Sequence, residues 1–558
     1  MTPEYKAEKE AFVSHLSGGG MWEINAVTLA APVCLSRALQ VKIVADVSTQ
    51  AAALLWSVLQ NRQGFFKTDS VPALATDFLL HCCAILFSTT VYAGAPQVLL
   101  GLLVLPTIAT LLQAPVDKEQ PGPAKPESNG KPADSRGEKP AADLDPLPVK
   151  PFFTTYRGAM MIVTCCSILA VDFPVFPRRF AKTESFGTSL MDMGVGSFVF
   201  AAGTVAARQQ LKEEISGAPS FPDRLKTALR HSVPLIVLGF IRLWSVKGLE
   251  YAEHVSEYGV HWNFFFTLGL LPIAFAIFQP ILRFTPSYGG LAFFLAICYE
   301  LLLYIPQGMK AYIILSERKP GDWLSQNREG VFSLIGYFCI FLAGIGIGHG
   351  ILPRDPDPNE RPPPPEKDHM DEDADWLASV IGDAKQQREA EEGPKASLDL
   401  SGLGKPELPK GTFFHLIKWT GLWFIFAVWA MWRYGPRLFV SRRMANLAYV
   451  VWVCAFNTAQ LLLFYMVERI VFGDLYNAKS KAVEKQRVTD ATSTVMKAFN
   501  RNGLALFLLA NLLTGAINMS VETLRMGDVE AMAILVGYMT VICGTALALD
   551  RANISIKL

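Results

Sequence analysis

The sequence is poor in charge and lacks the cysteine and histidine patterns of metal and redox sites. Charged residues make up 18% of its 558 residues, and 51 lysines and arginines against 50 aspartates and glutamates give a formal net charge of +1. This balance gives no indication of a nucleic-acid partner, and we expect none. The nine cysteines form no Cys-x-x-Cys pair and no cluster with histidine at zinc spacing. Because all of them fall in apolar runs, we interpret them as small hydrophobic residues and expect no metal and no tightly bound cofactor.

A cleavable secretion signal is also missing. The first twenty residues are charged and then glycine-rich, without the apolar core of a signal peptide. Such a start does not resemble a signal that is removed after export. We therefore expect the first apolar span to direct the chain to the membrane.

Long apolar runs are the main feature that is present. Hydrophobic residues make up 51% of the chain and aromatic residues 11%, and the mean hydropathy is +0.28. The apolar blocks are roughly 17 to 25 residues long, which is the length that a helix needs to cross a bilayer. The sequence predicts an all-α, polytopic membrane protein with about thirteen transmembrane helices. The expected spans are 24–44, 71–92, 95–114, 155–172, 186–207, 231–246, 260–279, 287–305, 331–352, 412–432, 445–467, 502–519 and 529–549.

Two hydrophilic inserts interrupt the apolar blocks. The first is rich in proline, lysine and glutamate, the second joins a proline run to an acidic run, and neither has enough apolar residues to fold alone. We expect both to be disordered, solvated linkers. The inserts divide the chain into 1–114 (a lumenal N-terminal segment and three spans), 115–154 (the first linker), 155–353 (the core spans), 354–410 (a cytosolic linker) and 411–558 (four spans).

Basic residues predict the orientation of the chain. Lysines and arginines concentrate in one set of alternate loops, including 208–230 and 468–501, and such loops face the cytosol by the positive-inside rule. An odd number of spans then places the C-terminus in the cytosol and the N-terminus in the lumen. The unusual polar segments all fall on the lumenal side, where we expect them to form one site. These segments are 18–27, 172–186, 250–265, 327–333 and 441–447.

The turn within 170–197 combines prolines with charged residues close to hydrocarbon depth, where ionisable groups are expensive and mark functional sites. Asp172 ends an apolar run, so burial would raise its pKa while Lys182 would lower it, as in a tuned general base. An ion pair between Asp172 and Lys182 that closes the turn is the alternative interpretation. Asp192 begins the next span, where it can contact a ligand or pair with an arginine.

Two arginine pairs lie on the same face, against the positive-inside trend. They are Arg178 with Arg179 and Arg442 with Arg443. A guanidinium can bind a phosphate or carboxylate through two parallel hydrogen bonds, so an anionic ligand or a buried acidic partner would explain both pairs. Anchoring of the arginines at lipid headgroups is the alternative.

Two histidines are candidate proton carriers. His254 and His261 are seven residues apart, which places them on one face if a helix continues through both. Either can act as a base or proton shuttle near neutral pH. His261 lies beside Trp262, so it also suits an aromatic belt at the membrane boundary.

Five segments, taken in order, resemble one protein family. They are LAVDFPVFPRRFAKTESFGTSLMDMGVGSFVF, LEYAEHVSEYGVHWNFF, NREGVFSLIGY, SRRMANL and NGLALFLLANLLTGAINMS. They are similar to the multi-pass inositol acyltransferase family of glycosylphosphatidylinositol (GPI) anchor biosynthesis, and only the inserts and the spacing of the cytosolic loops fall outside the resemblance. It implies an endoplasmic reticulum enzyme that moves a fatty acyl group, expected to be palmitoyl, from acyl-CoA to the inositol 2-hydroxyl of glucosaminyl-phosphatidylinositol.

The implied reaction suggests roles for the polar residues. Asp172 would be the general base, Lys182 would fix it or donate to the oxyanion, and His254 or His261 would be the replacement base. The arginine pairs would hold the phosphates of CoA and of the lipid, in either order, and no acyl-enzyme is expected because no serine or cysteine lies in an elbow-like motif with histidine. The other candidates for substrate binding are Glu23, Asn25, Asp192, Glu253, Glu257, Asn263, Asn327, Arg328 and Asn446.

Other functions remain open at this stage. A lipid transporter or flippase would also place charges near helix ends, although the sequence shows no internal repeat and no matched pair of broken helices. A membrane-bound O-acyltransferase of another type would use His261 as its base on a different acceptor. A structural subunit would explain the spans but not the clustered charges.

Overall fold

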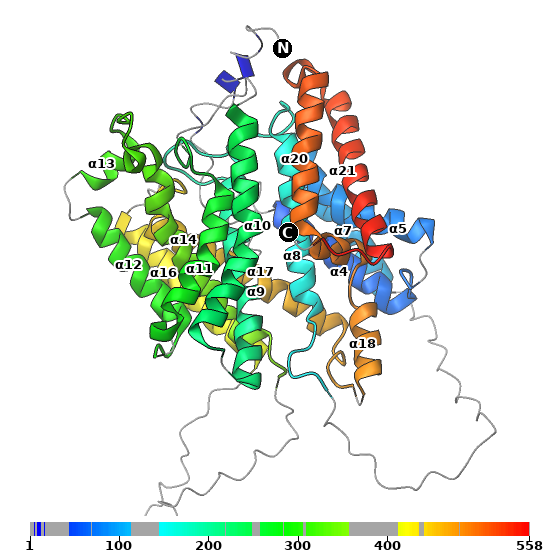
Figure 1. Ribbon diagram of the computed structural model, residues 1–558. Coiled ribbons are helices and arrows are strands. Elements are labelled where there is room, and N and C mark those ends of the chain that lie inside the picture. Colours follow the sequence, from blue (N-terminus) through cyan, green and yellow to red (C-terminus); the bar gives the residue numbers. More distant parts are fainter. Residues whose placement is uncertain are drawn as a thin grey trace, which may run out of the picture.

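The computed structural model describes most of the chain and is built from helices and loops, with no strand in the part that it describes. This confirms the all-α, polytopic architecture (Figure 1). The described ranges are 44–67, 70–112, 144–217, 219–247, 257–282, 284–304, 308–355, 411–434, 440–478 and 480–556, together with Tyr5, Glu8, Lys9, Ala11, Phe12 and Leu16 near the N-terminus.

Nine helical segments in the described ranges are long and apolar enough to cross a membrane. They are α5 with the π-helical turn η1 and α6 (Val71–Phe78, Leu79–Cys83 and Ala84–Thr89), α8 (Pro151–Ala170), α9 (Leu190–Ser216), α11 (Phe264–Leu282), α14 (Trp323–Ile351), α16 (Thr412–Tyr434), α17 (Leu447–Val471), α20 (Gly503–Ser520) and α21 (Asp528–Arg551). The remaining helices are α4 (Val44–Gln63), α7 (Pro96–Leu112), α10 (Phe221–Lys247), α12 (Tyr288–Tyr304), α13 (Met309–Ile314), α18 (Lys481–Asp490) and α19 (Thr494–Arg501).

Every expected span from 71–92 onward coincides with a helix, whereas the first, 24–44, lies almost wholly outside the described residues. The loop expected at 45–70 is wrong, because α4 occupies most of it. Serine, threonine and glutamine alternate with alanine and leucine in α4, so hydropathy alone does not detect a helix whose Ala52 and Trp56 are buried. It packs mainly against α7, and also against α6 and α17.

The start of α14 also differs from the expectation. Residues 327–333 were expected in a loop, but the helix already begins at Trp323, because the Asp322 carboxylate accepts hydrogen bonds from the backbone amides of Leu324 and Ser325. A side chain that satisfies the first amides of a helix stabilises its start. Polar residues that were assigned to a loop therefore lie in the first turns of a buried helix.

The centre of the bundle is formed by α8, α9, α14 and α17, in which α9 and α17 each contact the other three helices. Close approach of α9 and α14 requires glycine, since a Cβ on Gly203 would lie 2.1 Å from the backbone oxygen of Phe341. Small residues allow membrane helices to pack at such short range.

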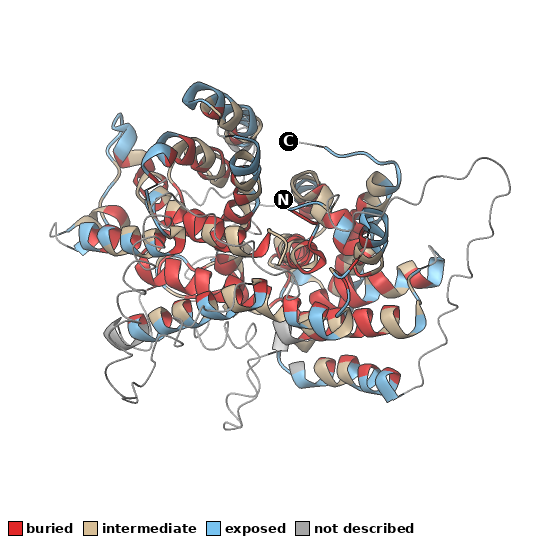
Figure 2. Cartoon of the chain, turned by 90° about the horizontal axis from the view of Figure 1, so that it is seen from below, coloured by how far each residue is buried: buried red, intermediate tan, exposed pale blue. Residues whose placement is uncertain are grey.

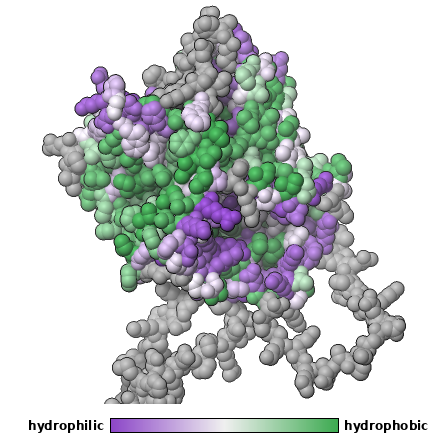
Figure 3. Space-filling view, viewed as in Figure 1, coloured by the Kyte–Doolittle hydropathy of each residue, from purple (hydrophilic) through white to green (hydrophobic). Residues whose placement is uncertain are grey.

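Buried residues line the facing sides of the helices and exposed residues the outer sides (Figure 2). Hydrophobic surface covers the middle of the molecule in Figure 3, with hydrophilic surface toward its lower part and upper left.

The short helix α19 is attached to the bundle by a buried carboxylate. Asp77 accepts hydrogen bonds from the Ser493 hydroxyl and the Val495 amide at the start of α19, and its Oδ1 lies 2.7 Å from His81 Nδ1.

All eight cysteines of the described ranges are free, and all but Cys298 are buried, in keeping with their interpretation as small hydrophobic residues.

Candidate functional site

Asp172 lies in the connection between α8 and α9, near the N-terminal segment. It is 8% exposed. Its Oδ2 accepts a hydrogen bond of 2.7 Å from Asn518 Nδ2, and its Oδ1 lies 3.6 Å from Lys9 Nζ. Lys182 instead pairs with Glu257 over 3.2 Å. The interpretation of Asp172 and Lys182 as one ion pair is therefore wrong, because the turn directs the two side chains to different partners.

Asp192, in the first turn of α9, is completely buried. Its Oδ2 accepts hydrogen bonds of 2.7 to 3.1 Å from the amide and hydroxyl of Thr183 and from the hydroxyl of Ser189. Its Oδ1 pairs with Arg442 Nε over 2.6 Å. Ser189 caps α9 by accepting from the Asp192 amide. Asp192 thus joins the turn to the loop that precedes α17.

Arg442 lies between two carboxylates. Besides its contact with Asp192, its Nη2 is 3.5 Å from Glu257, which also receives Lys182. The ring of Tyr258 lies 5.8 Å from the guanidinium, and burial raises the pKa of this tyrosine despite the nearby cation. Burial alone would lower the pKa of Arg442, but the attraction of Glu257 and Asp192 outweighs it and raises that pKa well above its usual value. Arg442 is therefore a fixed cation.

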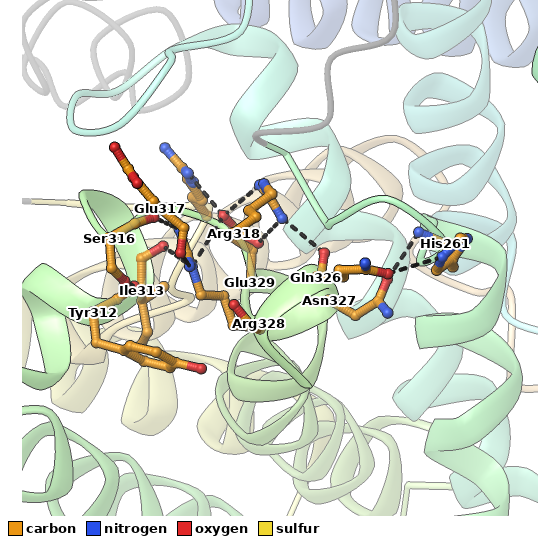
Figure 4. A network of polar contacts seen from close by, with 12 residues as sticks. His261, Tyr312, Ile313, Ser316, Glu317, Arg318, Gln326, Asn327, Arg328 and Glu329 are labelled. Atoms are coloured by element: carbon orange, nitrogen blue, oxygen red, sulfur yellow. Dashed lines mark hydrogen bonds and ion pairs between the residues drawn. The ribbon is translucent and has the colours of Figure 1, made fainter. Parts of the chain in front are cut away.

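Glu329, in α14, is completely buried and shared by three arginines (Figure 4). Its Oε1 lies 2.8 Å from Nη2 of Arg318 and 2.8 Å from Nη2 of Arg443, and 3.8 Å from Nε of Arg328. Arg328 also donates to backbone carbonyls of the segment 313–317. Since a buried charge is expensive unless it is paired, these contacts tie the α13–α14 connection to the loop before α17.

Four residues that were predicted in the site, His261, Asn263, Asn327 and Asn446, make hydrogen bonds within the protein. Asn327 departs from helical geometry (φ −122°, ψ 19°), and its Oδ1 accepts from the His261 amide over 2.8 Å. The His261 ring nitrogen Nε2 lies 3.1 Å from Gln326 Oε1 (Figure 4). Asn263 and Asn446 accept from the first amides of α11 and α17. Their contacts explain these side chains as helix caps and links, and a role in substrate binding stays a prediction.

Arg178 supports the fold of the turn. Its Nη2 donates to the carbonyls of Val171, Phe173 and Phe176 over 2.8 to 3.1 Å, and its guanidinium lies 3.9 Å from the centre of the Phe12 ring. Burial lowers the pKa of Arg178 to about 10, so it is still charged at neutral pH.

Arg179 contacts the connection between α6 and α7. Its Nη2 donates to the Ala93 carbonyl over 3.0 Å, and its guanidinium lies 4.9 Å from the Phe180 ring centre. These contacts attach the turn to the residues between α6 and α7. Anion binding by the pair of Arg178 and Arg179 stays a prediction, although carbonyl groups already take their main hydrogen bonds.

Four of the predicted site residues cannot be compared with the structure. Glu23, Asn25, Glu253 and His254 lie outside the described residues. The structure brings Lys182, Asp192, Glu257 and Arg442 into one cluster, and Arg328 and Arg443 into a second cluster around Glu329.

Sequence reasoning missed Lys9, Asn518, Glu329 and Arg318. Lys9 and Asn518 are separated by most of the chain, and no local pattern predicts their contact. The one available signal was the position of Glu329, which directly follows Arg328 in the sequence and is a carboxylate that can pair with the arginines.

A largely apolar cavity lies between α4, α8, α9 and α17. Its lining includes Tyr156, Val163, Met193, Ser197 and Phe456. Met193 follows Asp192 in the first turn of α9, and Ser197 lies one turn further into the bundle. The cavity therefore lies along one side of the first two turns of α9.

Comparison with known proteins identifies the relatives of the chain. The family model described as GWT1 matches residues 5–549. GPI-anchored wall transfer protein 1 of Aspergillus fumigatus is 46% identical over 559 residues, which cover 100% of this chain and 99% of that protein. The proteins of the same name from Candida albicans and Saccharomyces cerevisiae are 36% and 35% identical, with at least 99% of each chain covered. The chain therefore belongs to the GWT1 family.

Proposed function

We propose that this protein acts in GPI biosynthesis as an acyl-CoA-dependent O-acyltransferase. The acceptor would be the inositol 2-hydroxyl of glucosaminyl-phosphatidylinositol, and the donor a long-chain acyl-CoA such as palmitoyl-CoA. The names of the relatives support the GPI pathway. The resemblance of the polar segments to the inositol acyltransferases supports the reaction.

The observation that carries this proposal is the environment of Asp172. Its Oδ2 is held by Asn518, but its Oδ1 faces Lys9 at 3.6 Å, a distance longer than a hydrogen bond. A carboxylate oxygen with remaining acceptor capacity can take a proton from an alcohol. Asp192 is less suited to this role because hydrogen bonds already occupy both of its oxygens.

In the proposed reaction Asp172 Oδ1 accepts the proton of the inositol hydroxyl while the inositol oxygen attacks the thioester carbonyl carbon. The tetrahedral intermediate then expels the CoA sulfur, the C–S bond breaks, and the proton passes from Asp172 to the thiolate. The products are the ester and free CoA. Each proton and electron pair is thus accounted for without a metal or an acyl-enzyme.

The cationic clusters would stabilise negative charge in this reaction. The Lys182 side chain is 39% exposed, so its ammonium is accessible to an oxyanion or a phosphate next to Glu257 and Arg442. Around Glu329 three guanidiniums share one carboxylate, and Arg318 retains 23% exposure. A phosphate of the lipid or of CoA would complement this positive charge.

The apolar cavity beside Met193 would hold part of an acyl chain. Its lining from four helices is mainly apolar, and its polar residues are Thr49, Thr164, Ser197, Gln460 and the hydrogen-bonded Tyr156 and Asn457. Burial of methylene groups contributes about 0.8 kcal/mol for each CH₂.

We further propose that the protein resides in the endoplasmic reticulum membrane with its N-terminus in the lumen and its C-terminus in the cytosol. Basic loops on one side support this orientation. On the other side the described N-terminal residues contact the end of α20 and the segment before α21, at the top of Figure 1.

The test is acyl transfer in reconstituted proteoliposomes that contain only this protein. Radiolabelled palmitoyl-CoA and glucosaminyl-phosphatidylinositol should give a labelled lipid, and an acceptor without the inositol 2-hydroxyl should give none. Folded protein that transfers no label would contradict the enzyme, and movement of the lipid between leaflets without acyl-CoA would favour a flippase. In sealed microsomes an N-terminal tag should resist added protease, and its cleavage would reverse the orientation.

A further inference from the structure

The partners of Asp172 come from two segments at opposite ends of the chain. Asn518, near the end of α20, donates from Nδ2 to Asp172 Oδ2 over 2.7 Å. Lys9 Nζ donates to Asn518 Oδ1 over 2.8 Å and lies 3.6 Å from Asp172 Oδ1. The three side chains close a triangle at the start of the turn between α8 and α9.

We propose that Asn518 and Lys9 are positioning residues for Asp172, an inference that rests on the proposed acyl transfer. A lysine ammonium can only donate hydrogen bonds, so Lys9 fixes the amide oxygen of Asn518 toward itself. The amide NH₂ must then face Asp172. This arrangement holds Oδ2 and leaves Oδ1 as the oxygen that meets the substrate hydroxyl.

The N-terminal segment has further contacts that hold Lys9 over the turn. The Tyr5 hydroxyl accepts a hydrogen bond from the Leu524 amide over 3.2 Å, and Glu8 pairs with Arg525 over 3.3 Å. The Leu16 carbonyl accepts from the Glu184 amide over 3.2 Å. Lys9 is thus fixed by contacts on both sides of it, and its side chain is 17% exposed.

The charge of Lys9 also contributes to the position of Asp172. Lys9, from the N-terminal segment, and Arg178, from the turn, are both cations close to this carboxylate. Opposite charges attract, so Lys9 holds the Asp172 side chain as well as the Asn518 amide. Loss of the Lys9 charge should therefore lower kcat, whereas an arginine at this position should preserve it.

The kinetic test uses the full chain in proteoliposomes with Asn518→Ala, Lys9→Met and Lys9→Arg. Asn518→Ala should lower kcat about tenfold to a hundredfold, as expected for loss of a hydrogen bond to a charged group, with KM for acyl-CoA little changed. Lys9→Met should lower kcat about threefold to tenfold, because the Asn518 amide is then free to rotate away from Asp172, and Lys9→Arg should restore it. Glu8→Gln is the matched control, since it breaks a neighbouring contact of the same segment but does not touch Asp172.

A second measurement tests the contact without activity. A membrane-permeant carbodiimide should join Lys9 to Asp172 in wild-type protein, and mass spectrometry should find the linked peptides in the wild type but not in Lys9→Met. Absence of the link, or active variants with unchanged kcat, would overturn the positioning role alone. Wild-type protein that forms the link but transfers no acyl group would overturn the proposed function, and the positioning role with it.

Discussion

Two carboxylates at the ends of one turn have opposite surroundings. Asp192 is completely buried and accepts hydrogen bonds from three donors besides its pair with Arg442. Asp172 has one hydrogen bond from Asn518 and a longer contact with Lys9. Both residues stand next to an apolar span in the sequence, so their local patterns do not distinguish them.

The number of partners distinguishes the two carboxylates. Asp192 is bonded at both oxygens, and its removal would leave Arg442 with an uncompensated buried charge. Asp172 Oδ1 can receive a hydroxyl while Oδ2 stays fixed by Asn518. Under the proposed function, Asp192 would therefore stabilise the turn and Asp172 would take part in the reaction.

The largest expected effect is on activity in Asp172→Asn. Loss of the general base should reduce acyl transfer by about three orders of magnitude. The melting temperature should change little, because an amide can still accept the hydrogen bond from Asn518. The measurement is the initial rate of acyl transfer beside thermal unfolding in the same detergent.

Asp528→Asn is the control for this substitution. Asp528 is exposed at the start of α21, so the change removes the same charge without altering a buried contact. If Asp172→Asn were about as active as Asp528→Asn, Asp172 would not be the general base. His261 would then become the candidate base.

Asp192→Asn should have its main effect on stability. Removal of one member of a buried ion pair costs about 3 to 5 kcal/mol, so the variant should unfold at a clearly lower temperature and give less folded protein. Denaturation followed by tryptophan fluorescence measures this loss. A variant as stable as Asp172→Asn would show that the hydrogen bonds of Asp192 contribute little and would remove the contrast.

Arg178→Lys should have the smallest of these effects. A lysine cannot reproduce the planar fork that reaches three carbonyls, so we expect a loss of about 1.5 to 3 kcal/mol in stability. The KM for acyl-CoA should be unchanged. Arg179→Lys, the same substitution at the neighbouring position, is the control. A large rise in KM with normal stability would instead support the phosphate-binding interpretation of Arg178.

Much of the helical architecture could be predicted from composition and hydropathy. A bilayer requires about twenty apolar residues for each span, and the described helices from α5 to α21 include one for each expected span after the first. Helix α4 was missed because its apolar residues are mixed with polar ones and become buried only when it packs against α6, α7 and α17. The first turns of α14 were missed because Asp322 caps a polar helix start that hydropathy assigns to a loop.

The candidate site could be predicted in location but not in its pairs. Lys182 and Arg442 were expected on one face, and the structure connects them through Glu257. The partners of Asp172 could not be derived, since Lys9 and Asn518 are 509 residues apart and Asn518 is 346 residues from Asp172. Such contacts depend on how helices pack, for which a single sequence contains no direct signal.

Hydropathy and composition were sufficient to predict the membrane class, most of the helices and the unusual turn after α8, because the cost of placing polar groups in hydrocarbon acts on each segment separately. Which charges meet depends on how the helices pack. A side chain that reaches across several helices finds its partner only after they pack, and this packing assigned Asp192 to Arg442 and Asp172 to Asn518 and Lys9.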